Sequence, residues 1–556
     1  MSTNNTNEHQ VGGLREPSDV CVVGSGPAGL VVAAELVRRG LSVTMLESGA
    51  VHHDHERQQL SAASVTGDPI NHFNAIENRT RRLAGNSNAW VVKTAGQTAD
   101  EQMGLRYGLI DPEDVAERPW VAGSGWPITF DELEPWLHRA HEHFAIGADD
   151  YDPPTSARGN ALGEDFWADF DAKWFRFGLS DEFRSRLVSE LRASSLCRIQ
   201  TDATVVELII DQGDGAITAA RYRDNDGESS VRSSRFVLAC GAIENARLLL
   251  TSDRGNGGIG NEHDNVGRYF MDHPLFSIGH VEVESDKAID AMAFFDLADV
   301  GTGVVHGYAS TSAALSEELE ATRMAFSIFP RPSERHLVAA DTLKWLLQNP
   351  KQQLKNPEEL LRSLTKIASG VDYFPRAAFN SLLRHRSLLP GYGRGGWGDG
   401  VGGMGFTRLE VVLQCEQPPL FDSRVSLSHT TDAFGSALPK VDWKIGEQVR
   451  TSVLAVQKRI AEYVEQAGLG TYVPRAGSFD ELGVPSSMAH HMGTTRMSHR
   501  PEDGVVTPNG RVHNVPNLFI AGSSVFPTSG YVNPTLTLVA LAERLADHIA
   551  TASGAE

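Results

Sequence analysis

The feature that most constrains the fold is a glycine-rich stretch near the beginning of the sequence, residues 24–29, with the letters GSGPAG. A short apolar run at 20–23 precedes it, and a helix-forming pattern follows it as far as Gly40. A second apolar run at 42–46 then ends at the acidic residue Glu47. This order of strand, glycines, helix, strand and acid predicts a βαβ unit that binds a dinucleotide.

Each glycine of this stretch has a mechanical role. Gly24 permits a tight turn, Gly26 lets a pyrophosphate approach the backbone, and Gly29 allows the helix to pack closely on the strand. The N-terminus of the helix predicted after these glycines presents free N–H groups and the positive end of the helix dipole, which favour phosphate. Three glycines alone would be weak evidence, because an ordinary turn can have the same composition.

Glu47 narrows the choice of nucleotide. An acid at this place binds the ribose hydroxyls, and its charge disfavours a 2′-phosphate, so FAD or NAD fits better than NADP. A second glycine-rich stretch at 255–262 follows no apolar strand pattern, and we expect it to be a flexible loop. The chain therefore carries one dinucleotide fingerprint, whereas two would suggest a flavin reductase that uses a nicotinamide cofactor.

The composition is that of a globular protein. The 556 residues can bury a large core, and 41% of them are hydrophobic. A net charge of −21 argues against nucleic acid as a partner. No run of 18 apolar residues is present, so we expect no membrane span. Residues 1–15 are polar, lack a signal-peptide pattern and predict a disordered lead.

The cysteines are dispersed along the chain, and at least two stand inside apolar runs. They predict small core residues rather than a disulfide frame or a metal cluster, which favours a cytoplasmic location and no metal site. The four cysteines are Cys21, Cys197, Cys240 and Cys415.

Several later apolar runs predict further strands of the sheet that begins at the glycine-rich stretch. Residues 196–210 alternate as a strand does, and 235–240 form a buried strand pattern that turns through Gly241 into a helix. The run at 518–522 is a further buried strand pattern that ends at Gly522. These patterns predict an α/β fold with a Rossmann-type, doubly wound parallel sheet.

The region between these strands predicts a second, β-rich domain. Residues 276–330 are rich in strand patterns, and 447–467 have the spacing of an amphipathic helix. A helical insertion is predicted at 341–405. Over 341–394, nine basic residues stand against four acidic ones. This local excess could mark a lid, an anionic-membrane contact, an electron-acceptor surface or a solvated helical hairpin.

A dense group of small and amide residues precedes Trp90. Asn86, Ser87 and Asn88 suit a loop that lies against a planar cofactor. An ordinary turn cluster would have the same composition, so this pattern leaves both interpretations open.

Two polar clusters near the C-terminal end carry the candidate catalytic residues. One is HHMGTTRM with His490 and His491; the other contains Asn533, followed by Pro534 and Thr535 at the start of the last predicted helix. Histidine suits a general base because its unperturbed pKa lies near neutral pH, and asparagine can hold a substrate oxygen without titrating. A helix N-terminus here could also stabilise charge on a reduced flavin. From the residues alone, either histidine could be the base.

Together these motifs resemble the glucose–methanol–choline (GMC) family of flavoprotein oxidoreductases, over nearly the whole chain and in order. The motifs are GSGPAG with Glu47, AGNSN, GWPI, Val205-Val206, ACGAIENARLLL, VGRYFMDHP, HHMGTTRM and VNPTLTLVALAERLADHI. The resemblance implies bound FAD, alcohol substrates and hydride transfer to flavin N5.

The resemblance also assigns roles to residues. In this family the catalytic histidine lies three residues before a Gly-Thr pair, which selects His490 over His491 as the base for the hydroxyl proton. Asn533 would orient the substrate oxygen, and Val206 would contact adenine through its backbone. The implied cofactor-binding residues are Gly24, Gly26, Pro27, Ala28, Gly29, Glu47, Asn86, Ser87, Asn88, Val206, Gly522, Asn533, Pro534 and Thr535.

Within the family the motifs are most similar to those of pyranose oxidases and bacterial glycoside 3-oxidases. This similarity implies a sugar or glycoside whose C2 or C3 hydroxyl becomes a ketone. Fungal pyranose oxidases have a flavin-linking histidine just before a tryptophan, where this chain has Ala89, so we expect noncovalent FAD. Val91 stands where a threonine is usual, so contacts to flavin N5 and reactivity toward oxygen can differ.

The resemblance predicts a discontinuous domain arrangement. An FAD-binding domain would comprise 16–59, 190–275 and 485–552. A flavin-covering loop and cap would occupy 60–189, and a substrate-binding domain with the helical insertion would occupy 276–484.

These observations lead to several hypotheses about function, which belong to different classes of protein. The leading one is an FAD-dependent oxidase of sugars or glycosides, and an alternative is a dehydrogenase that passes electrons to a quinone or a redox protein. A second alternative is a GMC-type hydroxynitrile lyase. A nonenzymatic flavin-binding protein is disfavoured because the candidate base and its asparagine partner are both present. Glu416 and Gln417, which follow an apolar strand pattern, could line the substrate face or be structural.

Overall fold

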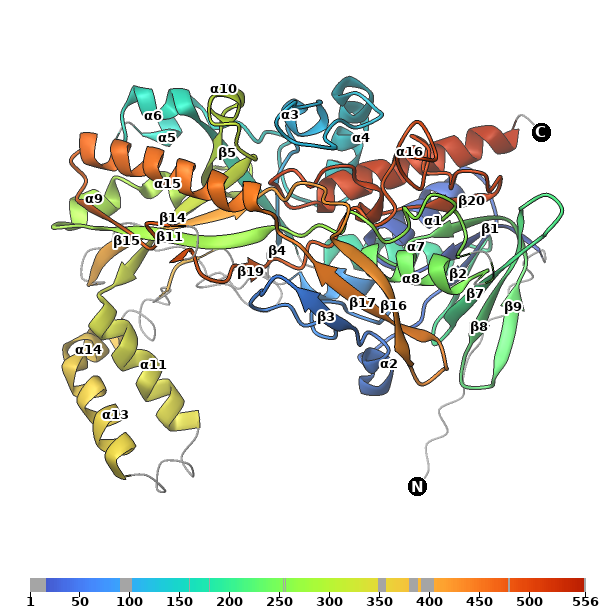
Figure 1. The fold of residues 1–556 in the computed structure, drawn as a ribbon, viewed down its shortest axis with the longest axis horizontal. Coiled ribbons are helices and arrows are strands. Elements are labelled where there is room, and N and C mark those ends of the chain that lie inside the picture. Colours follow the sequence, from blue (N-terminus) through green and yellow to red (C-terminus); the bar gives the residue numbers. More distant parts are fainter. Residues whose placement is uncertain are drawn as a thin grey trace.

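Two large β-sheets lie side by side in the computed structural model, with helices packed over them (Figure 1). The structure describes residues 17–90, 103–159, 161–179, 181–253, 255, 257–348, 357–379, 389–391, 405–478 and 481–554.

The first sheet has five parallel strands in the order β20-β10-β1-β2-β6. Parallel strands covered on both faces are expected to be apolar throughout, and β1 and β2 are nearly continuously buried. The strands are β1 (Ser18–Val23), β2 (Val43–Leu46), β6 (Cys197–Gln200), β10 (Ser233–Leu238) and β20 (Leu518–Ile520). The predicted α/β fold with a parallel, Rossmann-type sheet is confirmed.

The segment 196–210 was predicted as one strand, and the structure corrects this to two strands. Asp202 adopts a left-handed backbone conformation, with φ at 60°, and its N–H donates to the carbonyl of Gly49. The turn ends β6 and starts β7 (Thr204–Ile210), which pairs antiparallel with β8 in a separate sheet. That sheet comprises β7, β8 (Ile217–Arg223) and β9 (Glu228–Val231).

Five longer helices lie around the parallel sheet in the described residues. Helix α1 contacts β1 and β2 and packs against α7 and α16, and α16 also packs against α4. Helix α4 begins with a capping box in which Thr129 and Glu132 bond reciprocally to backbone N–H groups. The helices are α1 (Pro27–Arg38), α4 (Phe130–Glu142), α7 (Glu182–Ala193), α8 (Ala242–Thr251) and α16 (Thr535–Gly554). Helix α16 begins where the sequence predicts.

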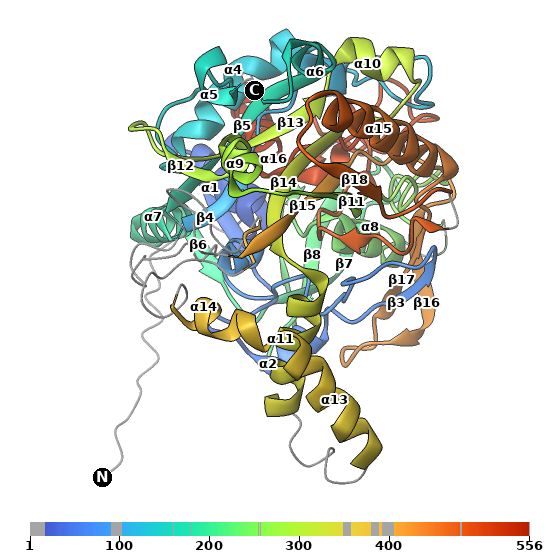
Figure 2. The same cartoon turned by 90° about the vertical axis from the view of Figure 1, so that its left-hand side faces the viewer.

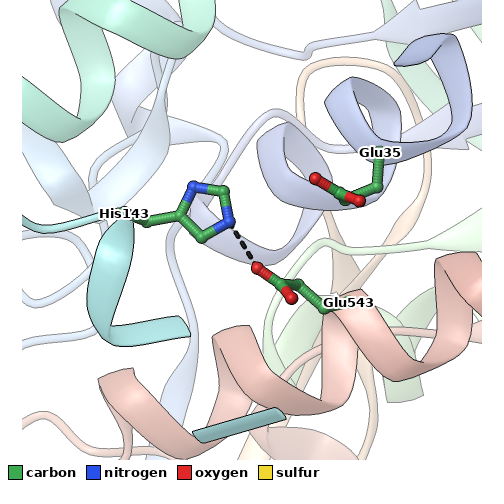
Figure 3. A group of neighbouring side chains, drawn as sticks. All are labelled: Glu35, His143 and Glu543. Atoms are coloured by element: carbon green, nitrogen blue, oxygen red, sulfur yellow. Dashed lines mark hydrogen bonds and ion pairs between the residues drawn. The ribbon is translucent and has the colours of Figure 1, made fainter. Parts of the chain in front are cut away.

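A buried ionic cluster joins α1, α4 and α16 (Figure 3). His143 Nε2 lies 2.5 Å from Glu543 Oε1, and Glu35 is the third ligand-type side chain nearby. Three such groups could hold a metal ion. Here, however, Arg139 Nε lies 2.9 Å from Glu543 Oε2 and Arg38 pairs with Glu35 at 2.5 Å. Because arginines supply the countercharge, the cluster ties three helices together rather than forming a cation site.

The second sheet is mainly antiparallel, in the order β18-β11-β15-β14-β13-β5-β4, with β12 on β13 and β19 on β11. It combines strands from early and late parts of the chain. These are β4 (Met103–Tyr107), β5 (Phe170–Leu179), β11 (Pro274–Glu282), β12 (Leu297–Asp299), β13 (Val304–Thr311), β14 (Met324–Pro332), β15 (Phe406–Cys415), β18 (Thr471–Pro474) and β19 (Ser486–Ser487).

Helix α15 (Glu447–Gln466) packs on this second sheet, and its apolar residues Val453, Val456, Ile460 and Val464 are buried as the helical spacing predicts. A smaller sheet comprises β16 (Arg424–Thr431), β17 (Ala437–Trp443) and β3 (Ser64–Gly67). Shorter helices are α2 (His55–Gln59), α3 (Pro112–Val115), α5 (Thr155–Arg158), α6 (Glu164–Asp169), α9 (Asp286–Asp290) and α10 (Ala313–Glu318). In the described helices we find none with both the length and the apolar character needed to cross a bilayer.

The predicted insertion contains a helical hairpin that projects from the body of the molecule (Figures 1 and 2). It begins with α11 at Glu334 rather than at 341, and its second helix α13 buries Ser363 while Leu361 and Leu364 are exposed by 67% and 50%. The helices are α11 (Glu334–Gln348), α13 (Pro357–Ser369) and α14 (Phe374–Ala378). The remainder of the insertion, at 349–356, 380–388 and 392–404, lies outside the described residues.

Candidate functional site

The glycine-rich turn forms an open cradle between β1 and α1. A Cβ at Gly24, where φ is +98°, would lie 2.6 Å from the carbonyl oxygen of Ala239, and a Cβ at Gly29 would lie 2.0 Å from that of Gly24. By contrast, a Cβ at Gly26 would meet no atom closer than 3.8 Å. Helix α1 then starts at Pro27 without a side-chain cap. The first N–H groups of α1 are therefore available to a phosphate, as a bound dinucleotide requires.

Glu47 closes this turn from the end of β2. Its Oε2 accepts hydrogen bonds from the backbone N–H of Ser25 at 3.0 Å and from Ser25 Oγ at 2.6 Å, and its Oε1 accepts from the N–H of Gly49 at 2.7 Å. Burial raises the pKa of Glu47, and these hydrogen bonds act in the opposite direction. An ionised carboxylate accepts about four hydrogen bonds, so one position is left for a ribose hydroxyl.

The loop before Trp90 lies across the glycine-rich turn. The N–H of Ala84 donates to Ser25 Oγ at 3.0 Å, and a Cβ at Gly85 would lie 2.9 Å from the Cα of Gly26. This placement agrees with a loop that covers a cofactor.

The polar side chains of this loop hold its own backbone. Asn86 Oδ1 accepts from the N–H of Thr80 at 2.6 Å, and Ser87 Oγ donates to the carbonyl of Ala84 at 2.6 Å. Asn88 Nδ2 donates to two carbonyls of the loop at 2.8 and 2.9 Å. Direct cofactor contacts of Asn86, Ser87 and Asn88 therefore stay predictions, whereas their role in shaping the loop is visible.

Val206 occupies a β-bulge. The pairing of β7 with β8 shifts between Val205 and Glu207, so Val206 stands outside the regular ladder. The N–H of Ala203 donates to the carbonyl of Glu47 at 2.9 Å, which places this strand beside the end of β2. A backbone group outside the ladder next to the glycine-rich turn is suited to the predicted adenine contact.

Gly522 and Asn533 come from the last part of the chain. Gly522 follows β20 with φ at +113°, and a Cβ there would lie 3.8 Å from the Cβ of Ala28. Asn533 precedes Pro534 and Thr535 at the start of α16 and is 1% exposed. The structure thus brings the start of α16 and the glycine-rich turn to the same side of the parallel sheet.

Two hydrogen bonds fix the amide of Asn533. Its Nδ2 donates to the carbonyl of Arg106 at 3.0 Å, and its Oδ1 accepts from Gln414 Nε2 at 3.3 Å. Gln414 in turn donates to the carbonyl of Tyr531 and accepts from Arg106 Nη2 at 2.8 Å. Asn533 is therefore held from the second sheet, by a backbone carbonyl of β4 and a side chain of β15.

His490 is half-buried and is fixed at two points. Its backbone N–H donates to Asp272 Oδ1 at 2.8 Å, and its ring Nδ1 lies 2.9 Å from His273 Nδ1. Desolvation, reinforced by the neighbouring His273 and by Arg106, lowers the pKa of His490 well below its usual value. A neutral imidazole is the form that can accept a proton, so this environment keeps the His490 ring in the form that a candidate base needs.

His491 has a different environment. Its ring lies 5.2 Å from that of Phe73 and 5.6 Å from that of Phe270, and its Nε2 has no hydrogen-bond partner among the described residues. Burial lowers its pKa to about 3. These contacts are those of a packed core side chain, so the geometry favours His490 as the base.

Glu416 and Gln417 serve the structural role that the sequence left as one of two alternatives. Glu416 accepts two hydrogen bonds from Arg118, at 2.5 and 2.6 Å, in a buried ion pair. Gln417 accepts from Trp443 Nε1 at 2.7 Å and from the N–H of Asp272 at 3.1 Å. Neither side chain is exposed.

Sequence reasoning missed the side chains that support His490 and Asn533. The motif VGRYFMDHP contains Asp272 and His273, yet nothing in its letters indicates contact with His490 more than 200 positions later. The bridge between Met271 and Met492 makes that contact possible. Gln414 and Arg106 also gave no signal, because each is a polar residue within a strand of the second sheet.

The structure has a nucleotide cradle on a parallel sheet and a candidate histidine base beside a second, antiparallel sheet. This combination is that expected of a nucleotide-dependent oxidoreductase. Comparison with known sequences specifies this class. Residues 180–275 and 419–542 match two domain profiles described as GMC oxidoreductase, and residues 17–63 match one described as FAD binding domain. The chain belongs to the GMC oxidoreductase family and is an FAD-dependent oxidoreductase.

Individual relatives are distant or cover short segments. The fructose dehydrogenase large subunit of Gluconobacter japonicus is 24% identical, with 96% of this chain and 97% of that protein covered. C-glycoside 3-oxidase of Arthrobacter globiformis is 48% identical over 67 residues, which are 12% of this chain and 13% of that protein. Among solved structures, pyridoxine 4-oxidase from Mesorbium loti has a TM-score of 0.54 at 16% identity, covering 96% and 99% of the two chains.

Proposed function

We propose that this protein oxidises a secondary ring hydroxyl of a sugar or glycoside, at C2 or C3, to a ketone. The observation that carries the proposal is the fixed position of His490, whose backbone and Nδ1 are both held, together with the fixed amide of Asn533, which is held from the second sheet. A rigid base and a rigid oxygen-binding amide are what alcohol oxidation requires of the protein.

Each residue has its own role in the proposed oxidation. His490 accepts the hydroxyl proton at its second ring nitrogen, Nε2. Asn533 Nδ2 carries a second N–H that can hold the substrate oxygen while the proton moves. Bound FAD supplies the acceptor for the hydride from the carbinol carbon. Gly26, the start of α1 and Glu47 would hold its pyrophosphate and ribose, and the shape of the cradle fits these groups.

Support for a sugar or glycoside comes from the relatives. Fructose dehydrogenase is similar over nearly the whole chain, and C-glycoside 3-oxidase is similar over a short segment at higher identity. Pyranose 2-oxidase of Tricholoma matsutake is 35% identical over 86 residues, or 16% of this chain and 15% of that protein. These similarities support a carbohydrate substrate.

We also propose that FAD is bound noncovalently. Ala89 ends the short 3₁₀ helix Gly85–Ala89 and stands where fungal pyranose oxidases have their flavin-linking histidine, and alanine offers no atom for such a bond. Precipitation of the protein with acid should release all yellow colour into the supernatant. Flavin that remains with the pellet would show a covalent link at another residue.

We propose a cytoplasmic location because the cysteines have free thiols. All four cysteines are free, and none forms a disulfide. Burial raises the pKa of Cys21 and Cys240 to about 12, so both behave as inert core residues of a reducing compartment.

The test of the proposed function is an anaerobic visible spectrum during titration with monosaccharides and glycosides, followed by exposure to air. Bleaching by a sugar and rapid recovery in air would establish a sugar oxidase. Bleaching without recovery would indicate a dehydrogenase that needs a quinone or a redox protein. A flavin that no sugar and no other alcohol bleaches would contradict the proposal and favour the hydroxynitrile lyase alternative.

A further inference from the structure

The ring of His273 lies between the candidate base and a fixed backbone carbonyl. His273 is fully buried at the start of β11, with its Nδ1 2.9 Å from His490 Nδ1 and its Nε2 3.3 Å from the carbonyl oxygen of Ser529. The two rings meet nearly at right angles, at 86°. His273 therefore has a hydrogen-bond partner at each ring nitrogen.

The Ser529 carbonyl determines which ring nitrogens of His273 and His490 carry a proton. A carbonyl oxygen only accepts hydrogen bonds, so His273 Nε2 must carry the N–H that faces Ser529. In a neutral imidazole the other nitrogen is then an acceptor, and His273 Nδ1 has a lone pair. The short Nδ1–Nδ1 contact needs one donor, which must be Nδ1–H of His490. The opposite assignment would place a lone pair of His273 against the carbonyl.

The surrounding groups make this arrangement rigid. Ser529 is fixed because its Oγ accepts from the N–H of Gln417 at 3.0 Å. Asp272 Oδ1 accepts from the backbone N–H of both His273, at 2.7 Å, and His490, at 2.8 Å. Ser487 Oγ donates to the other Asp272 oxygen at 2.5 Å. One carboxylate thus holds the backbones of both histidines in register.

We propose that His273 is a positioning residue that fixes the tautomer of His490, with Nδ1 protonated and Nε2 left as the proton acceptor. This inference rests on the proposed role of His490 as the base. Its consequence is that the base enters every catalytic cycle with its lone pair already on the correct nitrogen, so that no tautomer exchange has to precede proton transfer.

The electrostatics are consistent with two neutral rings. Burial lowers the pKa of His273 to about 4, and desolvation together with His273 and Arg106 lowers the pKa of His490 well below its usual value. The donor and acceptor assignment above requires a neutral His273, since a protonated imidazole has no acceptor nitrogen. A neutral His490 is required for its Nε2 to accept a proton.

The test compares His273→Gln with His273→Leu in the FAD-loaded protein. A glutamine amide can accept from His490 Nδ1 through its oxygen and donate to the Ser529 carbonyl through its nitrogen, whereas leucine can do neither. We expect His273→Gln to keep the rate of flavin reduction within about tenfold and His273→Leu to lose about 10²–10⁴-fold, the upper figure being the loss that a wrong histidine tautomer causes in a serine protease triad. Substrate KM and bound FAD should be similar in both variants.

Nitrogen NMR of the FAD-loaded protein, labelled at the histidine ring nitrogens, gives a readout that does not need a substrate. The His490 signals, assigned by their loss in His490→Gln, should show protonated Nδ1 in the wild type and in His273→Gln, but not in His273→Leu. The pair His513→Gln and His513→Leu is the control. His513 Nε2 contacts Ser498 Oγ at 3.1 Å, and this contact involves neither His273 nor His490. Its two members should have equal reduction rates.

The outcomes separate the two claims. Protonated Nε2 on His490 in the wild type, or equal rates in the glutamine and leucine variants of His273, would overturn the proposed role of His273. A wild-type protein whose flavin no sugar reduces would instead contradict the proposed function, and the NMR comparison would still report on the tautomer.

Discussion

A single methyl group added at Gly29 would prevent α1 from packing closely on β1. The added Cβ would lie 2.0 Å from the carbonyl oxygen of Gly24, which is backbone and cannot move aside without opening the turn. At Gly26 the nearest atom would be 3.8 Å away, on the side where the phosphates of a dinucleotide approach. We propose that these two glycines, three residues apart, have separable roles, Gly29 in the fold and Gly26 in the cofactor site.

We therefore expect Gly29→Ala to yield little folded protein and Gly26→Ala to yield folded protein that binds FAD less tightly. The measurements are the yield of soluble protein, the circular dichroism spectrum and the dissociation constant for FAD. Equal FAD affinity in Gly26→Ala and the wild type would show that this face of the turn does not approach the phosphates.

Some residues of the site could be predicted from patterns between sequence neighbours, and others could not because their partners are distant in sequence. Gly24, Gly26 and Glu47 were predictable because strand, turn and helix are neighbours in sequence. Asp272 and Gln414 were not, because their partners His490 and Asn533 become neighbours only after the two sheets have formed. The family resemblance selected His490, and the physical difference between His490 and His491 became visible only in their contacts.

Among the elements, β15 and α13 show how differently apolar residues can be placed. Leu413 in β15 is fully buried between β11 and β14, where it pairs with Phe276 and Phe326. Leu361 and Leu364 in α13 are on the projecting hairpin and are largely exposed. Helix α13 packs against α11, and its least exposed residues are Ser363 and the half-buried Leu360 and Ile367, so Leu361 and Leu364 lie outside that face.

From this contrast we expect Leu413→Ala to destabilise the protein by about 2–5 kcal/mol, through lost burial and a cavity. Leu361→Ala and Leu364→Ala should each change stability by less than about 0.5 kcal/mol, since both side chains already face solvent. The midpoint of denaturant unfolding measures all three. A large loss of stability in Leu361→Ala would mean that another surface covers the hairpin in solution.

The element order was largely predictable, and the pairing of distant elements was not. The βαβ unit, the helix from Glu447 and the start of α16 at Thr535 follow from local periodicity and from turn or cap residues. The second sheet pairs β5 with β13 and β11 with β15, partners far apart in the chain. Sequence patterns predict that such strands exist but do not specify their register.

At the scale of the whole molecule, buried neutral histidines make stability depend on pH. Burial lowers the pKa of His306 and of His491 to about 3, whereas both would titrate near pH 6.5 in the unfolded chain. Between these values the unfolded state binds more protons than the folded state, so stability is present above pH 6.5 and falls as the pH is lowered toward 3.

Thermal unfolding should therefore show a midpoint that decreases steadily from pH 7 to pH 4.5. His491→Phe, whose new ring would lie beside Phe73 and Phe270, should show a smaller decrease over the same range because one of the titrating groups is gone. A decrease of the same size in this variant would mean that His491 is protonated in the folded state or accessible to solvent.

The central claim is that His490 is the base of an alcohol-oxidising flavoprotein, and the most direct measurement is the rate of anaerobic flavin reduction after rapid mixing with a reducing sugar or glycoside. We expect His490→Ala to keep bound FAD and to reduce it about 10²–10⁴-fold more slowly than the wild type, as loss of a general base does. His491→Ala, the adjacent control, should lose stability but retain most of the reduction rate. Fast reduction in His490→Ala, or loss of reduction in His491→Ala alone, would contradict the account.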